Sequence, residues 1–469
     1  MRIINVKKGE SAVGKLKLFL FVMNLCLLIA FLFFVLIQGK LYSQELMKNV
    51  FSEKKQVGEI RHNEKVRSVI ASSRYIAVLS DPNEVNGIGN VTLYDLNGNK
   101  LWNQRINAGQ ISMGKNADRV IVNHSLRYDY LKSSCYDLEG NKLWEVSTTD
   151  PGLTMSDNGK YGITTRIAHD EEGGKFQVFD LSNGNEINIP IEKDYNYFRA
   201  KFLNDQEVVV LIQKMIQVRD EECLKEVNKR INEYYEESLN EQSDDRGEKR
   251  WDKIKMGYDR RKCIEDKMLP LKLIIYDIPT NTIKVDRELT SENGDSVWVY
   301  RYESGIIEVS DDGKHFTLEA CYGEYKPETE STLVYLINDK GIQLWESKNY
   351  RKIISMKLID KKYVILEDWN GRNSIINLIS LTQGRRIWSY TYDAGYLGGI
   401  QKCLLKNDNI YIQTSYGIHI NPKYLFMNLK TGQNVADIDK NESLIFIERT
   451  TDEMDVLLDR ASNQILFLK

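Results

Sequence analysis

The chain repeats a short unit in which two apolar runs flank a polar turn. The stretch YDLNGNKLW begins at Tyr94, and the nearly identical YDLEGNKLW begins at Tyr136, 42 positions later. Further copies are FDLSNGNEI at 179, YDIPTNTIK at 276, INDKGIQLW at 337, ISLTQGRRIW at 379 and MNLKTGQNV at 427. Turn residues such as Asn-Gly between apolar runs favour a tight β-hairpin. Each copy therefore predicts a strand, a turn and a second strand.

A second pair of strands precedes each hairpin. Examples are VRSVIASSRYIAVLSD from Val66, ISMGKNADRVIVNHS from Ile111 and ISMKLIDKKYVILED from Ile354. Alternating and β-branched residues around a polar break predict another antiparallel pair. The unit then has four strands, and its spacing matches the roughly 40–45 residues of a propeller blade. Because a ring of such sheets buries their faces against one another, we predict an all-β propeller.

The same pattern predicts the number of blades and the closure of the ring. The units span 65–107, 108–150, 151–193, 194–290, 295–349, 350–394, 395–440 and 441–469. The last unit is short and supplies three inner strands, so we expect residues 57–62 (VGEIRH) to supply its outer strand beside Ile465 to Leu468. Joining both ends in one blade removes the open edges. We predict an eight-bladed β-propeller over residues 57–469, with seven blades as the alternative if 441–469 pairs otherwise.

A tryptophan recurs at one place in the unit, on the predicted outer strand. The four residues are Trp102, Trp144, Trp345 and Trp388. Repetition in several units favours a structural role, filling the gap between neighbouring blades, over stacking on a ligand.

The D-L-x-G-x-K-x-W hairpin with its outer-strand tryptophan resembles the PQQ-like (quinoprotein-like) β-propeller repeats. The similarity covers residues 57–469 in pattern, although only the units at 94, 136, 337 and 379 carry the tryptophan. The resemblance implies the fold rather than an activity. Quinone-dependent dehydrogenases of this kind carry adjacent cysteines near the cofactor, and this sequence has no Cys-Cys dipeptide. The design is similar to a bacterial family of membrane-anchored propellers that act as noncatalytic scaffolds.

One long apolar stretch precedes the repeats. Residues 18–37 read LFLFVMNLCLLIAFLFFVLI, and a helix of that length spans a bilayer. Basic residues ahead of it predict a cytoplasmic tail at 1–16, a transmembrane helix at 17–38, a linker at 39–56 and an extracytoplasmic propeller on the plasma membrane. A cleavable signal peptide and a buried helix are the alternatives. The length of the run and the lack of an A-x-A-like site favour an uncleaved anchor.

The fourth unit contains a charge-rich insertion at 216–269. Two apolar stripes at helical spacing predict a helical hairpin there that turns back near 240–249. The stripe residues are Leu224, Val227, Ile231 and Tyr234 in the first half, and Trp251, Ile254 and Tyr258 in the second. Other long loops fall between the second and third strands of their units, so one rim of the ring is elaborated. We interpret the insertion as a partner-binding arm; a solvated arm with no partner is the alternative.

Cys223 and Cys263 are equidistant from the centre of that turn, at Ser243. An antiparallel helical hairpin would bring them side by side, and a disulfide there would stabilise an exported helix pair. Two separate thiols are the alternative, because connectivity does not follow from sequence.

Composition and motifs argue against several classes of function. The net charge is -3, from 64 basic and 67 acidic residues, which gives no field to attract nucleic acid. The five histidines are scattered, with no H-E-x-x-H pair, and the sequence has no P-loop, nucleophile elbow or dinucleotide-binding motif. We therefore predict no enzyme activity, cofactor or metal.

Two functions from different classes remain. The first is a membrane-anchored scaffold that binds an envelope protein through the arm of the fourth unit. The second is a propeller that binds, or hydrolyses, a small molecule or glycan in its central channel. A third, inward signalling by the N-terminal tail, is limited by a tail too short to form a catalytic domain.

Overall fold

The computed structural model describes most of the repeat region. The described residues are 56–81, 89–106, 108–124, 132–148, 152–164, 176–191, 197–229, 264–295, 297–299, 306–322, 331–359, 361–392, 398–406, 408–414, 424–438, 444–449, 455–459 and 464–468. The predicted tail, span and linker at 1–55 lie outside them.

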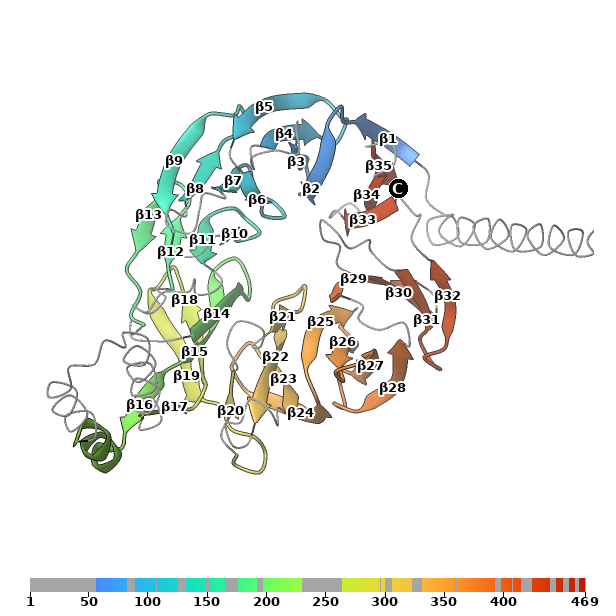
Figure 1. Cartoon of the computed structure of the whole chain (residues 1–469). Coiled ribbons are helices and arrows are strands. Elements are labelled where there is room, and N and C mark those ends of the chain that lie inside the picture. Colours follow the sequence, from blue (N-terminus) through green and yellow to red (C-terminus); the bar gives the residue numbers. More distant parts are fainter. Residues whose placement is uncertain are drawn as a thin grey trace, which may run out of the picture.

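Eight antiparallel sheets follow one another around a ring (Figure 1). Blade 1 contains β2 (Lys65–Ala71), β3 (Tyr75–Asp81), β4 (Gly89–Asp95) and β5 (Lys100–Ile106). Blade 2 contains β6 (Ala108–Ser112), β7 (Val120–His124), β8 (Lys132–Tyr136) and β9 (Lys142–Ser147). Blade 3 contains β10 (Leu153–Met155), β11 (Tyr161–Thr164), β12 (Val178–Asp180) and β13 (Asn185–Ile187). Blade 4 contains β14 (Tyr197–Phe202), β15 (Glu207–Gln213), β18 (Lys272–Asp277) and β19 (Thr282–Glu288).

The second half of the ring has the same plan. Blade 5 contains β20 (Val297–Trp298), β21 (Ile307–Val309), β22 (His315–Tyr322), β23 (Thr332–Asn338) and β24 (Gln343–Tyr350). Blade 6 contains β25 (Ile353–Ile359), β26 (Tyr363–Trp369), β27 (Ser374–Ser380) and β28 (Arg386–Tyr392). Blade 7 contains β29 (Ile400–Lys406), β30 (Asn409–Thr414), β31 (Tyr424–Asn428) and β32 (Asn434–Ile438). Blade 8 contains β33 (Leu444–Arg449), β34 (Asp455–Asp459), β35 (Gln464–Leu468) and β1 (Gln56–Arg61). In blade 5, β20 and β21 both pair with β22, so the inner strand is interrupted.

The two ends of the repeat region meet in blade 8. Strand β1 is its outermost strand and pairs antiparallel with β35, with Ile60 opposite Ile465 and Arg61 opposite Gln464. The prediction of an eight-bladed ring closed in this way is confirmed, and the seven-bladed alternative is wrong.

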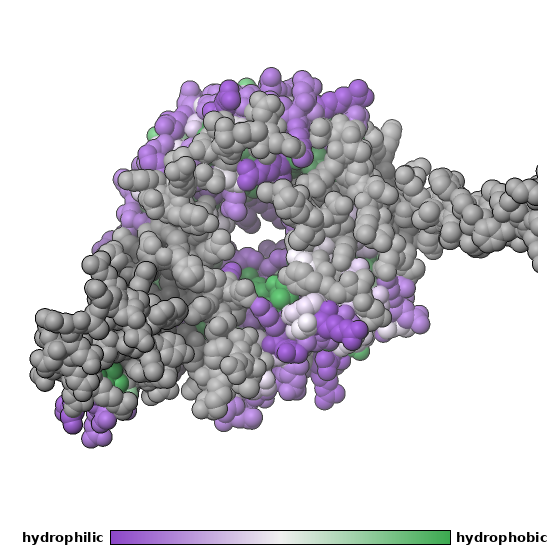
Figure 2. All heavy atoms as spheres, in the orientation of Figure 1, coloured by the Kyte–Doolittle hydropathy of each residue, from purple (hydrophilic) through white to green (hydrophobic). Residues whose placement is uncertain are grey.

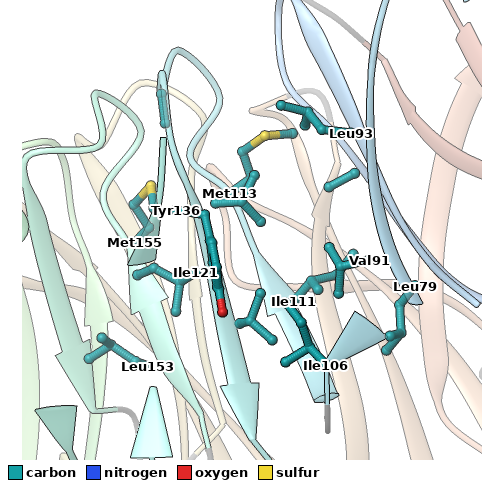
Figure 3. Close-up of a cluster of buried hydrophobic side chains, with 14 of the residues drawn as sticks. Leu79, Val91, Leu93, Ile106, Ile111, Met113, Ile121, Tyr136, Leu153 and Met155 are labelled. Carbon is teal, nitrogen blue, oxygen red and sulfur yellow. The ribbon is translucent and has the colours of Figure 1, made fainter. Parts of the chain in front are cut away.

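The core lies between blades, where sheet faces meet. One cluster joins blades 1, 2 and 3, with Leu79 and Val91 from blade 1, Ile121 and Tyr136 from blade 2, and Leu153 from blade 3 (Figure 3). Leu79, Val91 and Ile121 are completely buried. Because each face is covered by its neighbour, an isolated blade would expose this apolar area to water.

The insertion in blade 4 differs from its prediction at both ends. Met215–Arg219 (β16) and Ile264–Met268 (β17) form a two-stranded antiparallel sheet rather than helix. In β16 the β-branched Ile216 and Val218 alternate with Gln217 and Arg219, a period of two that favours a strand. Helix occupies 221–229. The remainder of the predicted helical hairpin lies outside the described residues.

Within the described part of the chain, no helix combines the length and the apolar character that a membrane span requires. Residues 18–37, on which the anchor prediction depends, lie outside the described residues.

Candidate functional site

The arm of blade 4 begins as a ribbon that continues the two middle strands of the blade. The register runs from Met215 opposite Met268 to Arg219 opposite Ile264. At its base, the Leu269 amide donates to the Lys214 carbonyl at 2.9 Å. The four strands of blade 4 pair without the ribbon, which forms a separate sheet. Figure 1 shows β16 and β17 pointing away from the ring, with helix 221–229 at their outer end.

Gln213, the last residue of β15, holds the base of the arm in place. Its side-chain amide donates to the Leu269 carbonyl at 2.7 Å, and its side-chain oxygen accepts from the Val299 amide at 2.9 Å. Gln213 is almost completely buried, so both hydrogen bonds are shielded from water. The arm is therefore attached to blades 4 and 5 together.

Asp220 starts the helix of the arm. Its Oδ1 accepts hydrogen bonds from the amides of Glu222 at 3.0 Å and Cys223 at 2.9 Å, which is an N-cap. Glu221 and Glu222 place negative charge in the first turn, where the helix dipole favours it.

The described part of the arm contains three of the predicted site residues. Val227 is 9% exposed and packs with Cys223 and Leu224, which are partly buried. Cys223 is disulfide-bonded, and its partner lies outside the described residues. The pairing with Cys263 stays a prediction. The other predicted arm residues, Ile231, Tyr234, Trp251, Ile254 and Tyr258, also lie outside the described residues.

The recurring tryptophans lie between neighbouring blades. The indole Nε1 of Trp144 donates to the Leu181 carbonyl at 2.9 Å, that of Trp345 to Leu381 at 2.6 Å, and that of Trp388 to Leu429 at 2.8 Å. Each acceptor lies in the hairpin turn of the next blade. In the turn that contains Leu181, Gly184 lies against the indole of Trp144. A Cβ at Gly184 would be 2.7 Å from Cγ of Trp144.

Trp102 packs differently from the other three. It contacts the ring of Tyr136 with centroids 5.9 Å apart, and it is 7% exposed. Its Nε1 is buried and has no hydrogen-bond partner among the described residues. The indole nonetheless lies beside Gly140 of the next hairpin turn, as its counterparts do beside theirs.

The inner strands surround an opening through the middle of the ring (Figures 1 and 2). Three of them carry a charged cluster formed by Glu308 on β21, Lys201 on β14 and Lys357 on β25. Lys201 Nζ lies 2.8 Å from Oε2 of Glu308, and Lys357 Nζ pairs with Oε1. The cluster thereby connects blades 4, 5 and 6.

The environment of Glu308 keeps it ionised. Its side chain is 13% exposed. Burial alone would raise the pKa of Glu308, but the nearby ammonium groups of Lys201 and Lys357 outweigh burial and lower that pKa below its usual value of 4.5. Both oxygens are engaged with a lysine, so Glu308 is poorly placed as a general base.

The described residues show no other reactive constellation at the inner strands. Cys403 on β29 lies near the cluster, but burial raises the pKa of its thiol to about 12, so the nucleophilic thiolate is scarce at neutral pH. In the part of the chain that the structure describes, no group of three or more His, Cys, Asp or Glu side chains could hold a metal ion.

Sequence reasoning missed Lys201, Glu308 and Lys357. They are separated by 107 and 49 positions, and each is a single charged residue in an otherwise ordinary inner strand. Among these site residues, only the helix cap Asp220 could have been found from the sequence, because an aspartate just before an apolar stripe at helical spacing is typical of an N-cap.

Comparison with known proteins assigns the chain to no family. No protein-family model matches the sequence, and no curated protein matches it significantly. Among solved structures, the chain is similar to BamB from Moraxella catarrhalis, with a TM-score of 0.47 and 11% identity over 89% of this chain and 99% of that chain. The Dos1 propeller gives a TM-score of 0.48 and 10% identity over 89% of this chain and 95% of that one. The dihydro-heme d1 dehydrogenase NirN gives a TM-score of 0.46 and 10% identity over 88% of this chain and 79% of that one. At these values we draw no functional conclusion from any of the three.

Proposed function

We propose that this chain is a single-pass, membrane-anchored β-propeller that acts outside the cytoplasm as a noncatalytic protein-interaction scaffold. The observation that carries the proposal is the arm on blade 4. Blade 4 has a complete four-stranded sheet without it, so the fold does not require the ribbon or the helix. An element that is capped, disulfide-linked and directed away from the ring is suited to contact another molecule.

The proposed membrane anchor and the proposed location outside the cytoplasm are inferred from the sequence. The apolar run at 18–37 and the basic residues before it support a membrane span with the propeller exported. A disulfide at Cys223 is consistent with an oxidising compartment. The resemblance to membrane-anchored PQQ-like propellers supports the same design.

The register of the ribbon allows a clean removal of the arm. Arg219 and Ile264 are directly opposite each other, so residues 220–263 can be replaced by Asn-Gly, which favours a two-residue hairpin turn. We expect the ring to fold with an unchanged thermal midpoint, while copurification of the envelope partner is lost. Retained copurification would reject the role of the arm.

Site-specific photo-crosslinking in intact cells identifies the partner directly. Lys225 is exposed on the helix of the arm, and Lys361 is a matched exposed lysine in the β25–β26 turn on the ring. We expect a discrete protein adduct from a photoreactive residue at position 225 and none from position 361. Adducts from both positions, or from neither, would contradict a specific contact through the arm.

The alternative function, binding a glycan or small molecule in the central channel, is favoured by the opening through the ring. Equilibrium dialysis of the purified chain with glycans and quinones tests it. Saturable binding that survives removal of residues 220–263 would favour the channel over the arm.

A further inference from the structure

His62 lies at the point where the ring closes. It follows β1, the outer strand of blade 8, and precedes β2, the inner strand of blade 1. The residue therefore belongs to the connection between the last blade and the first. Any change that displaces His62 acts on the strand that joins the two ends of the repeat region.

The imidazole of His62 is buried with one of its two nitrogens unsatisfied. The residue is 9% exposed. Its Nδ1 lies 2.8 Å from the hydroxyl of Tyr94 on β4, and the two rings meet edge to face with centroids 6.1 Å apart. Its Nε2 is buried and has no hydrogen-bond partner among the residues that the structure describes. Neutral imidazole tolerates this environment better than imidazolium, which must place two N–H donors and a charge.

Glu64, the carboxylate that acts electrostatically on His62, is already engaged by other groups. Glu64 Oε2 accepts from the Ser80 hydroxyl and Oε1 accepts from the Asn90 side-chain amide, each at 2.6 Å. Glu64 would nevertheless favour a charged His62, while Lys100, at the start of β5, disfavours it.

Other charged groups near this connection are turned to solvent or paired with each other. On β1, Arg61 Nε lies 3.0 Å from Oε1 of Glu59, and both side chains are exposed. On β2, Lys65 and Arg67 are exposed. The described residues of β35 are uncharged. At the end of β4, the Asp95 carboxylate is held by Asn97 and Asn99. Among the described residues, Glu64 is therefore the carboxylate that acts on the charge of His62.

We propose that protonation of His62 loosens the closure of the ring, so that the pairing of β1 with β35 weakens in mildly acidic solution. The proton comes from solvent and adds to whichever imidazole nitrogen carries no hydrogen in the neutral ring, and no covalent bond breaks. Among the described residues the buried cation then has no partner for its second donor, and the connection carrying β1 opens to hydrate it. This inference depends on the fold alone and holds whether or not the arm binds a partner.

The direction of the pH effect follows from the linkage between proton binding and opening of the ring. Burial, partly opposed by Glu64, lowers the pKa of His62 below its usual value of 6.5. The open state therefore binds more protons than the closed state, and the stability of the closure is complete above pH 6.5 and falls below it. If the closed state binds no proton, the open population rises by up to about tenfold between pH 7.5 and pH 5.5.

Hydrogen exchange on the intact, full-length chain measures this opening. Exchange of peptides covering β1 and β35 is followed at pH 7.5 and pH 5.5 and corrected for the pH dependence of intrinsic exchange. We expect opening of β1 and β35 to increase several-fold at pH 5.5, while β27 in blade 6 changes little. Equal changes in β1, β35 and β27, or no change, would overturn the proposal without bearing on the arm.

Three substitutions separate titration of His62 from loss of its contacts. His62→Phe keeps a buried ring that cannot be protonated, so the pH dependence should disappear; His62→Gln serves the same purpose if the phenylalanine variant does not fold. Tyr94→Phe removes the hydrogen bond but leaves His62 titratable, so the pH dependence should remain. His315→Phe on β22 is the control and should behave as the unmodified chain. Persistence of the full pH effect in a folded His62 variant would overturn the proposal.

Discussion

A tryptophan on the outer strand of one blade packs against a glycine in the hairpin turn of the next blade. Gly184 has a φ of 77°, and Trp144 lies against it while donating a hydrogen bond to the carbonyl of Leu181 in the same turn. The glycine therefore serves two purposes, because the turn needs a positive φ and the indole needs the space. The recurring turn glycine and the recurring tryptophan together form one contact between neighbouring blades.

The first prediction compares two glycines with similar positive φ angles. Gly294 has a φ of 81° and nothing within 4 Å of an added Cβ, so Gly294→Ala should cost only about 1 kcal/mol of backbone strain. Gly184→Ala adds a clash with Trp144, and should cost a further 1–3 kcal/mol, roughly, from overpacking. Denaturant midpoints of the two variants measure the difference. Equal midpoints would show that the indole moves aside freely.

The second prediction concerns Glu308, whose loss leaves two lysines without a counter-charge. Glu308→Gln should destabilise the ring by about 1–3 kcal/mol near neutral pH, less than for a fully buried pair because the lysines are partly exposed. Glu145 on β9 is a matched control, since it also lies between two lysines, Lys132 and Lys142, but on an outer strand. Glu145→Gln should change stability by no more than about 1 kcal/mol.

The pH dependence of the same variant has a defined sign. Because the pKa of Glu308 is lowered from 4.5, its contribution is complete above pH 4.5 and is lost as pH falls below that value. The difference in stability between the unmodified chain and Glu308→Gln should therefore shrink below pH 4.5. A difference that stays constant down to pH 3 would contradict the assigned direction.

At the scale of elements, buried polar side chains at the ends of second strands bind the start of the next blade. Asn123 at the end of β7 accepts from the Leu153 amide at 3.2 Å, and Glu367 on β26 accepts from the Gly399 amide at 2.9 Å. Gln213 makes the corresponding bond to blade 5 and also fixes the base of the arm. Adjacent sheets are therefore joined by hydrogen bonds to backbone as well as by apolar contact.

The third prediction tests the helix of the arm through its cap. Asp220→Ala removes the acceptor for the amides of Glu222 and Cys223 and should cost about 1 kcal/mol of local helix stability. Asp220→Asn retains an acceptor and should cost little. Hydrogen exchange of a peptide covering 221–229 reports the effect, with β18 as an internal reference. Equal protection in both variants would show that the disulfide alone holds the helix.

At the scale of the whole molecule, the ring depends on one strand from the start of the repeat region. Strand β1 covers the edge of β35, and Ile60 packs in the same cluster as Ile465 and Phe467 of blade 8 and Val66 and Ile76 of blade 1. Without β1, that edge and part of that cluster would face solvent. Exposed strand edges promote association between chains.

The fourth prediction follows from this closure. A chain starting at Gln56 should fold as a monomeric ring, whereas a chain starting at Glu64 should lose β1 and associate or aggregate. Light scattering and thermal unfolding of the two truncated proteins measure the difference. A monomeric, equally stable second protein would show that β1 is dispensable for closure.

The sequence alone determined the repeat and predicted eight blades, with seven as the alternative, and the strand that closes the ring. It could do so because alternating apolar residues and turn residues act locally and recur at a regular spacing along the chain. It also indicated that the insertion in blade 4 is a separate element. It misassigned the base of the arm as helix, since short alternating strands next to a charged helical stretch carry a weak local signal.

Only the tertiary structure decided which single residues meet. Lys201, Glu308 and Lys357 come from three blades, and His62 becomes buried only when the last blade packs against the first. The charge of a side chain can be read from the sequence, but its burial and its partners depend on how distant strands are stacked. For this protein the ring follows from local periodicity, whereas the electrostatics of its inner strands and of its closure follow from contacts between blades.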